Sequence, residues 1–209
     1  MSNISKNCLD KGLNDRIKNY CELKEIIPAD GISAVFSEDI CLEDFKEIIK
    51  DNDRFKWAEN STLKKKIDAL QLKEVVYIIF TDNFPFTEES IEKKYEKLKE
   101  DKIAICRKNN ENNATDSQIL KWKNLEENQE YCLYVGGSSD FTSRLRQHLG
   151  YGPESTYSLQ LKRWWSEAKI HIDVWDITDI VGEDSTKRQI IEDILWDKYD
   201  PLFGKQGAK

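Results

Sequence analysis

One short segment constrains the fold more than any other part of the chain. Residues 74–81 read EVVYIIFT, a dense run of β-branched and aromatic side chains that predicts a buried β-strand. No stretch of the chain approaches the roughly 18 consecutive apolar residues of a membrane span. We therefore expect a chain that folds around a sheet and makes no contact with a membrane.

Two later segments predict further strands. Residues 131–137, YCLYVGG, end in a glycine turn, and residues 170–177, IHIDVWDI, alternate apolar with polar side chains as a half-exposed strand does. Helical spacing of apolar side chains is found between and after the strands, at 88–105, 141–149 and 185–198. This pattern predicts an α+β fold with a small three-stranded, mainly antiparallel sheet flanked by helices.

Polar residues that can cap helices mark where some of these helices begin. Thr87 is the predicted N-cap of the helix at 88–105, and Ser185 or Thr186 that of the helix at 185–198. Residues 1–70 are predicted to be an N-terminal helical region, with helices at 43–49 and, capped by Ser61 or Thr62, within 56–70. We place a domain boundary near residue 70, so that the second domain covers 71–209.

Composition narrows the classes of function. The 209 residues include 32 Lys and Arg against 39 Asp and Glu, a net charge of −7, which is unlike a wholly basic nucleic-acid-binding domain. Five cysteines without a CxxC pair predict reduced thiols in a cytoplasmic protein, rather than disulfides or a zinc site. The N-terminus has no apolar core of a secretory signal, and two histidines leave little room for a His-rich metal site.

The residue types that suggest chemistry gather between 131 and 165. The strand there runs into Gly136-Gly137-Ser138, and glycines allow a backbone to approach a phosphate closely. A helix then presents Arg144 and His148 four residues apart, hence on one face. An Arg side chain matches the geometry of a phosphate, but a turn and a solvated arginine explain the same residues.

The arrangement resembles the GIY-YIG nuclease family. Tyr134-Val135-Gly136 stands where the family has its second tripeptide, and Arg144 and His148 follow at the family's spacing. Val75-Val76-Tyr77 resembles the first tripeptide, with Val75 in place of the usual Gly. Glu192 lies on a predicted helix nine residues before Pro201, as the family's metal-binding Glu precedes its Pro-containing tail.

The chain departs from the family pattern in two further ways. A long insertion, about residues 82–130, separates the two tripeptides where many members have a short hairpin. The family's usual Asn after the Pro falls on Gly204, and Lys205 or Gln206 is the candidate to replace its contact.

The resemblance implies a metal-dependent endonuclease that hydrolyses DNA phosphodiester bonds. Glu192 would hold one Mg²⁺ or Mn²⁺ ion, and Arg144 would stabilise the phosphate charge. Tyr77 would orient or deprotonate the attacking water, while Tyr134 and His148 would hold water or phosphate. The open alternatives are core positions for both tyrosines, a solvated His148, and a metal-binding role for Glu183, Asp184 or Asp193 instead of Glu192.

Around these catalytic candidates we expect a surface that binds substrate. Residues 151–165 interleave aromatic and basic side chains, although Trp164 and Trp165 fit a core equally well. Residues 140–169 carry five basic and three acidic side chains, so a local cationic face with a net charge of +2 is compatible with DNA. The predicted substrate-binding residues are Gly136, Ser138, Arg146, Lys162, Arg163 and Lys205.

The sequence is also compatible with two other functions. A catalytically impaired nucleic-acid-binding module and a protein-interaction module that uses the charged helix at 88–101 are the alternatives. If the chain does cut both DNA strands, one site per chain favours a homodimer. By analogy alone, the absence of a recognisable DNA-targeting domain favours a role in restriction or defence.

Overall fold

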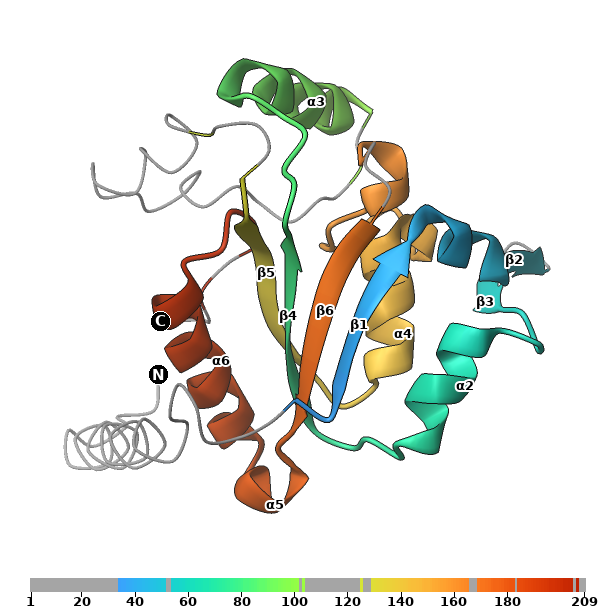
Figure 1. The fold of residues 1–209 in the computed structure, drawn as a ribbon, viewed down its shortest axis with the longest axis vertical. Coiled ribbons are helices and arrows are strands. Elements are labelled where there is room, and N and C mark those ends of the chain that lie inside the picture. The colour runs from blue at the N-terminus through green and yellow to red at the C-terminus, as the bar shows by residue number, and fades with distance from the viewer. Residues whose placement is uncertain are drawn as a thin grey trace, which may run out of the picture.

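The computed structural model describes residues 34–51, 54–101, 103, 125, 129–165, 169–182, 184–204 and 206. Their centre is a four-stranded antiparallel sheet in the order β1-β6-β4-β5, and a separate two-stranded sheet pairs β2 with β3 (Figure 1). The strands are β1 (Phe36–Cys41), β2 (Ile48–Asp51), β3 (Arg54–Trp57), β4 (Val75–Thr81), β5 (Tyr131–Ser138) and β6 (Lys169–Asp176). The α+β prediction is confirmed, and the prediction of a three-stranded sheet is wrong because β1 adds a fourth strand.

The prediction of an N-terminal helical region is wrong for the part of residues 1–70 that the structure describes. Only α2 (Thr62–Ala69) is an α-helix among the described residues before 70, and Ser61 caps it by accepting a hydrogen bond from the Lys64 N–H at 3.0 Å. The helix predicted at 43–49 is instead a 3-10 turn, η1 (Leu42–Glu47), followed directly by β2. Predictions for residues 1–33 lie outside the described residues.

The helices after β4 follow the predicted order with small changes. α3 (Glu88–Glu100) begins at the predicted cap Thr87 and ends five residues before the predicted end. α4 (Phe141–Arg146) continues into a π-helical turn, η2 (Gln147–Tyr151), and α6 (Ser185–Tyr199) is capped by Asp184 rather than by Ser185 or Thr186. Two short elements, η3 (Leu161–Arg163) and α5 (Thr178–Val181), complete the described set.

The sheet is covered by helices on both faces. Tyr77 and Ile79 of β4 belong to the core on the side of α4, whereas Val76 and Ile78 belong to the core on the side of α6. Figure 1 shows α6 and α4 on either side of the sheet. Because β4 lies between β6 and β5 and is buried on both faces, its sequence is continuously apolar rather than alternating.

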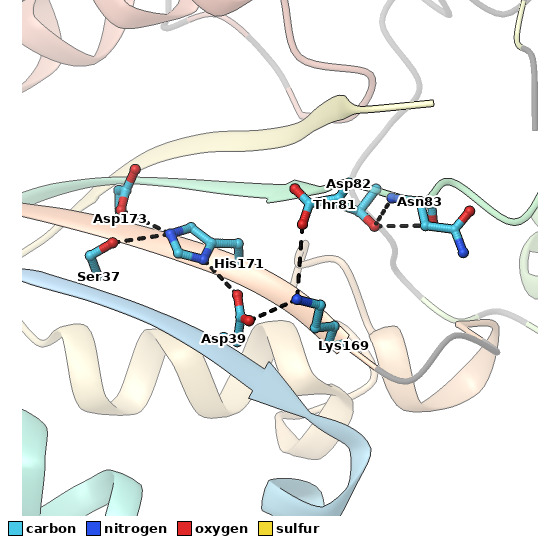
Figure 2. Close-up of polar contacts among 8 residues, drawn as sticks. All are labelled: Ser37, Asp39, Thr81, Asp82, Asn83, Lys169, His171 and Asp173. Atoms are coloured by element: carbon cyan, nitrogen blue, oxygen red, sulfur yellow. Dashed lines mark hydrogen bonds and ion pairs between the residues drawn. The ribbon is translucent and has the colours of Figure 1, made fainter. Parts of the chain in front are cut away.

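α6 covers the part of one sheet face that β5 and β4 form. On the same face of the sheet, β6 and β1 carry a polar network (Figure 2). The ring of His171 lies 2.7 Å from an Asp39 carboxylate oxygen and 3.2 Å from one of Asp173, and 3.0 Å from Ser37 Oγ. Lys169 pairs with Asp39 at 2.8 Å. Burial lowers the pKa of His171, but the hydrogen bonds to the two carboxylates outweigh it, so its pKa is raised.

The boundary near residue 70 and the domains 1–70 and 71–209 stay predictions. β1, which precedes that boundary, is hydrogen-bonded along its whole length to β6, which follows it. Among the helices that the structure describes, none has both the length and the apolar character needed to span a membrane.

Candidate active site

Four of the predicted site residues meet on the α4 face of the sheet. Tyr77 Oη lies 2.9 Å from His148 Nε2, and Arg144 Nε donates to the same phenol oxygen at 3.3 Å. Arg144 Nη2 donates to Tyr134 Oη at 3.1 Å. We call Tyr77, Tyr134, Arg144 and His148 the tyrosine–arginine cluster. Both tyrosines are buried in the core and are also hydrogen-bonded to Arg144, so a core position does not exclude a role in the site.

The hydrogen bonds around His148 place its ring proton. The backbone N–H of Leu159 donates to Nδ1 at 3.2 Å, so Nδ1 is the acceptor and Nε2 carries the proton of the neutral ring. Burial, together with the nearby charge of Arg144, holds the pKa of His148 well below its usual value. The imidazole is therefore neutral and donates its Nε2–H to the oxygen of Tyr77.

The Tyr77 oxygen thus accepts two N–H groups, one from His148 and one from Arg144. Burial raises the pKa of Tyr77 well above its usual value, and the Arg144 cation only partly opposes this. The phenol therefore keeps its proton at neutral pH. Such a group orients a water molecule by its O–H more readily than it removes a proton from one.

Arg144 is a permanent cation at the centre of the cluster. Burial lowers its pKa, but the two tyrosine oxygens outweigh burial and the pKa is raised. A third hydrogen bond, from Nη1 to Gln147 Oε1 at 2.9 Å, fixes the plane of the guanidinium group. Arginine has five N–H donors, so donors remain for an anionic ligand such as a phosphate.

Gly136 has a packing reason for being glycine. It lies opposite Tyr77 in the sheet, and a Cβ at this position would lie 2.5 Å from Tyr134 Cε1 and 2.7 Å from Tyr77 Oη. Carbon atoms in contact are normally about 3.5–4.0 Å apart. The tripeptide Tyr134-Val135-Gly136 therefore brings the two tyrosine rings together because its glycine has no side chain.

Glu192 approaches the same end of β5 from α6. The Gly137 N–H hydrogen bonds to its carboxylate, and a Cβ at Gly137 would lie 3.0 Å from Glu192 Oε2. Burial and the neighbouring charge of Asp193 raise the pKa of Glu192 to about 7, against the charges of Arg144 and Arg188. Gly136 and Gly137 therefore bring the backbone of β5 close to the cluster on one face and to Glu192 on the other.

The donor set suits a magnesium ion better than a metal that needs many protein ligands. Within the described ranges, no group of three or more His, Cys, Asp or Glu side chains is placed to hold a metal ion. Mg²⁺ keeps several waters and accepts one or two carboxylates plus substrate oxygens, so Glu192 alone is sufficient. Burial is the largest cause of the raised pKa of Glu192, so a cation that binds there would have to displace the proton from the carboxyl group.

The predicted substrate-binding side chains do not gather in the cluster. Arg146 Nη1 donates to the backbone carbonyls of Phe55 and Tyr151, so it ties β3 to η2. Lys162 lies 4.2 Å from the centre of the Tyr151 ring. Ser138 Oγ accepts from the backbone N–H of Asp140 at 3.0 Å and shapes the turn before α4.

The aromatic and basic stretch at 151–165 is divided between core and surface. Trp164 and Trp165 are buried, which settles their open alternative in favour of the core, while Tyr157 is 54% exposed. Arg163 pairs with Glu154 at 3.1 Å. Lys205 lies outside the described residues, and Gln206 donates to Asp197 at 2.7 Å.

Sequence reasoning missed two residues that hold the cluster in place. Gln147 accepts from Arg144, and its place three residues along the same helix was a usable signal. Gly204 has φ +106°, and a Cβ there would lie 2.9 Å from Tyr134 Cε2. The position expected to carry an Asn therefore packs its backbone against the tyrosine ring.

The sequence and the structure were compared with known proteins. No family model matches the sequence, and neither a curated protein nor a solved structure matches it.

Proposed function

We propose that the chain is an endonuclease that hydrolyses DNA phosphodiester bonds with the help of a bound Mg²⁺ or Mn²⁺ ion. The observation that carries the proposal is the hydrogen-bonded tyrosine–arginine cluster. Arg144 lies between the two tyrosine oxygens, and Tyr77 Oη contacts both Arg144 and His148. The charges of Arg144 and Glu192 also act on one another, so the carboxylate lies within electrostatic reach of the cluster.

The roles follow from the state of each group. Arg144 is always charged and keeps free donors, so it stabilises the charge that develops on the phosphoryl oxygens. Tyr77, held by two donors, uses its O–H to orient water, and the neutral His148 fixes the position of that phenol. A metal ion at Glu192 would supply Lewis-acid help to the phosphoryl and leaving oxygens. A cytoplasmic location and a homodimer belong to the same proposal.

A plasmid-nicking assay tests the proposal. Nicking is expected with Mg²⁺ or Mn²⁺ and not with EDTA, and Arg144→Lys or Glu192→Gln should lower its rate by about 100-fold or more. Matched controls carry analogous changes outside the cluster: Arg54→Lys at an exposed position of β3 and Asp197→Asn on α6. Full activity in both Arg144→Lys and Glu192→Gln would refute the mechanism.

A catalytically impaired nucleic-acid-binding module is the second candidate. The burial of Tyr77, only 1% exposed, favours it because the attacking water must reach a nearly enclosed oxygen. This candidate predicts a DNA gel shift that weakens with salt, with no metal-dependent product. A protein-interaction module acting through α3 predicts no gel shift even at low salt.

A further inference from the structure

A pocket of about 260 Å³ opens beside the tyrosine–arginine cluster. It lies between the C-terminal end of α2 and the turn from β5 into α4, and its walls are residues 67–68, 71–72 and 139–142. Phe141 belongs to the pocket wall and to the cluster's surroundings at once, since its ring centre lies 5.2 Å from that of Tyr77. Phe141 therefore connects the wall of the pocket to the tyrosine–arginine cluster.

The pocket combines a small apolar floor with a rim of hydrogen-bond acceptors. Ile67 and Phe141 form the floor of the pocket and are almost fully buried. Asp68 accepts from Lys64 and, at 3.4 Å, from Thr142, and Asp140 accepts from the Ser143 N–H at 3.0 Å. A carboxylate has about four lone-pair sites, so both retain acceptor capacity. Two carboxylates repel a phosphate and attract an N–H donor.

Gln71 brings a side-chain amide to the same rim in a strained backbone. Its φ is +51°, in the left-handed region that costs a non-glycine residue about 1 kcal/mol or more. Its N–H donates to the carbonyl of Asp68 at 3.1 Å, which ends α2. Glycine would end the helix without this cost, and strained non-glycine residues cluster at ligand sites.

We propose that this pocket binds one unstacked nucleobase of the DNA substrate, and that it selects a base whose major-groove edge presents an amino group, which is N6 of adenine or N4 of cytosine. The inference rests on the proposed function, because the phosphate held by Arg144 is what places a base here. Asp accepts from the amino group of cytosine, and Gln pairs with the edge of adenine, whereas thymine presents a carbonyl at that position. Unpaired or distorted DNA supplies such a base at the lowest cost in stacking energy.

Titration of the full chain with nucleosides, followed by amide NMR, tests the pocket without requiring cleavage. Deoxycytidine or deoxyadenosine should shift the amide signals of residues 68–72 and 139–142, with at least a fivefold weaker response to thymidine. Asp68→Asn and Gln71→Gly should each reduce this selectivity by threefold or more, and Gln71→Gly suits the backbone because glycine adopts its φ freely. Asp197→Asn, an equivalent charge change on α6, should leave the titration unchanged.

The outcomes separate this inference from the proposed function. Equal shifts with thymidine, no shifts in the pocket, or a stronger response to an arginine-rich peptide would overturn the base pocket, the last in favour of a protein partner. If nicking occurs, the cut positions should favour an adjacent adenine or cytosine, and Asp68→Asn should weaken that preference. If the base selectivity is found but nicking is not, the pocket stands and the nuclease proposal fails.

Discussion

Replacing each of the two neighbouring glycines of β5 by alanine should lower stability by different amounts. At Gly136, the new Cβ would lie 2.5 Å from Tyr134 Cε1 and 2.7 Å from Tyr77 Oη, which is about 1 Å closer than normal contact. Neither ring has room to retreat, since Tyr77 is 1% exposed and Tyr134 9%. Overpacking of this kind costs about 1–3 kcal/mol, and the lower chain entropy of unfolded alanine returns less than 1 kcal/mol.

We therefore expect Gly136→Ala to lower the free energy of unfolding by about 2 kcal/mol. With a urea dependence of about 2 kcal/mol per molar, the midpoint of unfolding should fall by about 1 M. The fluorescence of the six tryptophans provides the signal. Because the two rings must also move apart, nicking should fall together with stability.

Gly137→Ala is the matched variant on the other face of the strand. Its Cβ would meet Arg188 Cγ and Glu192 Oε2, both at 3.0 Å, and these flexible side chains can move. The urea midpoint should change by less than about 0.5 M, a cost of less than about 1 kcal/mol, whereas metal-dependent nicking should fall because Glu192 is displaced. An unchanged midpoint for Gly136→Ala, or a larger fall for Gly137→Ala, would refute the packing explanation.

Three further predictions concern charge and backbone. The pKa of Glu192 is raised to about 7, so the stability it contributes is complete below about pH 4.5 and is lost as the pH rises through 7. In urea unfolding with EDTA present, the free energy of unfolding of Glu192→Gln should equal that of the wild type at pH 4 and exceed it by up to about 3 kcal/mol at pH 8. The raised pKa of His171 acts in the same direction at higher pH: its contribution, about 1 kcal/mol or less at this partly exposed site, is present below about pH 6.5 and is lost as the pH rises further. His171→Gln should flatten the pH dependence of the urea midpoint between pH 6 and 8, and a slope equal to that of the wild type would contradict the network. Gly204→Ala should lower the free energy of unfolding by about 2–3 kcal/mol, more than Gly182→Ala does. Both glycines have positive φ, but only the Cβ at Gly204 would meet the rings of Tyr134 and Trp196. Equal unfolding midpoints for the two variants would show that the backbone conformation alone sets the loss of stability.

The parts of the fold that the sequence predicted are those with local causes. The apolar run of β4 and the alternation of β6 indicate strands by themselves, and Ser61 and Thr87 cap helices through bonds to the first turn. β1 was missed because its two core residues, Phe36 and Ile40, are four apart, which is helical spacing as well. Its strand conformation comes from pairing with β6, which no local pattern reveals.

The candidate site divides in the same way. The four-residue spacing of Arg144 and His148 predicted a shared helix face, and both contact Tyr77. By contrast, Arg146 is bound by carbonyls of β3 and η2, and this contact depends on where a distant strand lies. The contact between Gly204 and Tyr134 is equally non-local, so a residue type alone could not reveal it.

The order of the strands has a consequence for how quickly the chain can fold. In the main sheet Tyr77 pairs with Gly136, and Phe36 pairs with Val174, so strand neighbours are far apart in the sequence. Closing such loops costs chain entropy before the contacts stabilise anything, which slows folding to the range of milliseconds to seconds. Tyr77 also needs α4 and η2 around it before its oxygen has both of its donors, Arg144 and His148. The tyrosine–arginine cluster therefore forms as a product of sheet closure, so a refolding chain should regain secondary structure before it regains the hydrogen bonds between Arg144 and the two tyrosines.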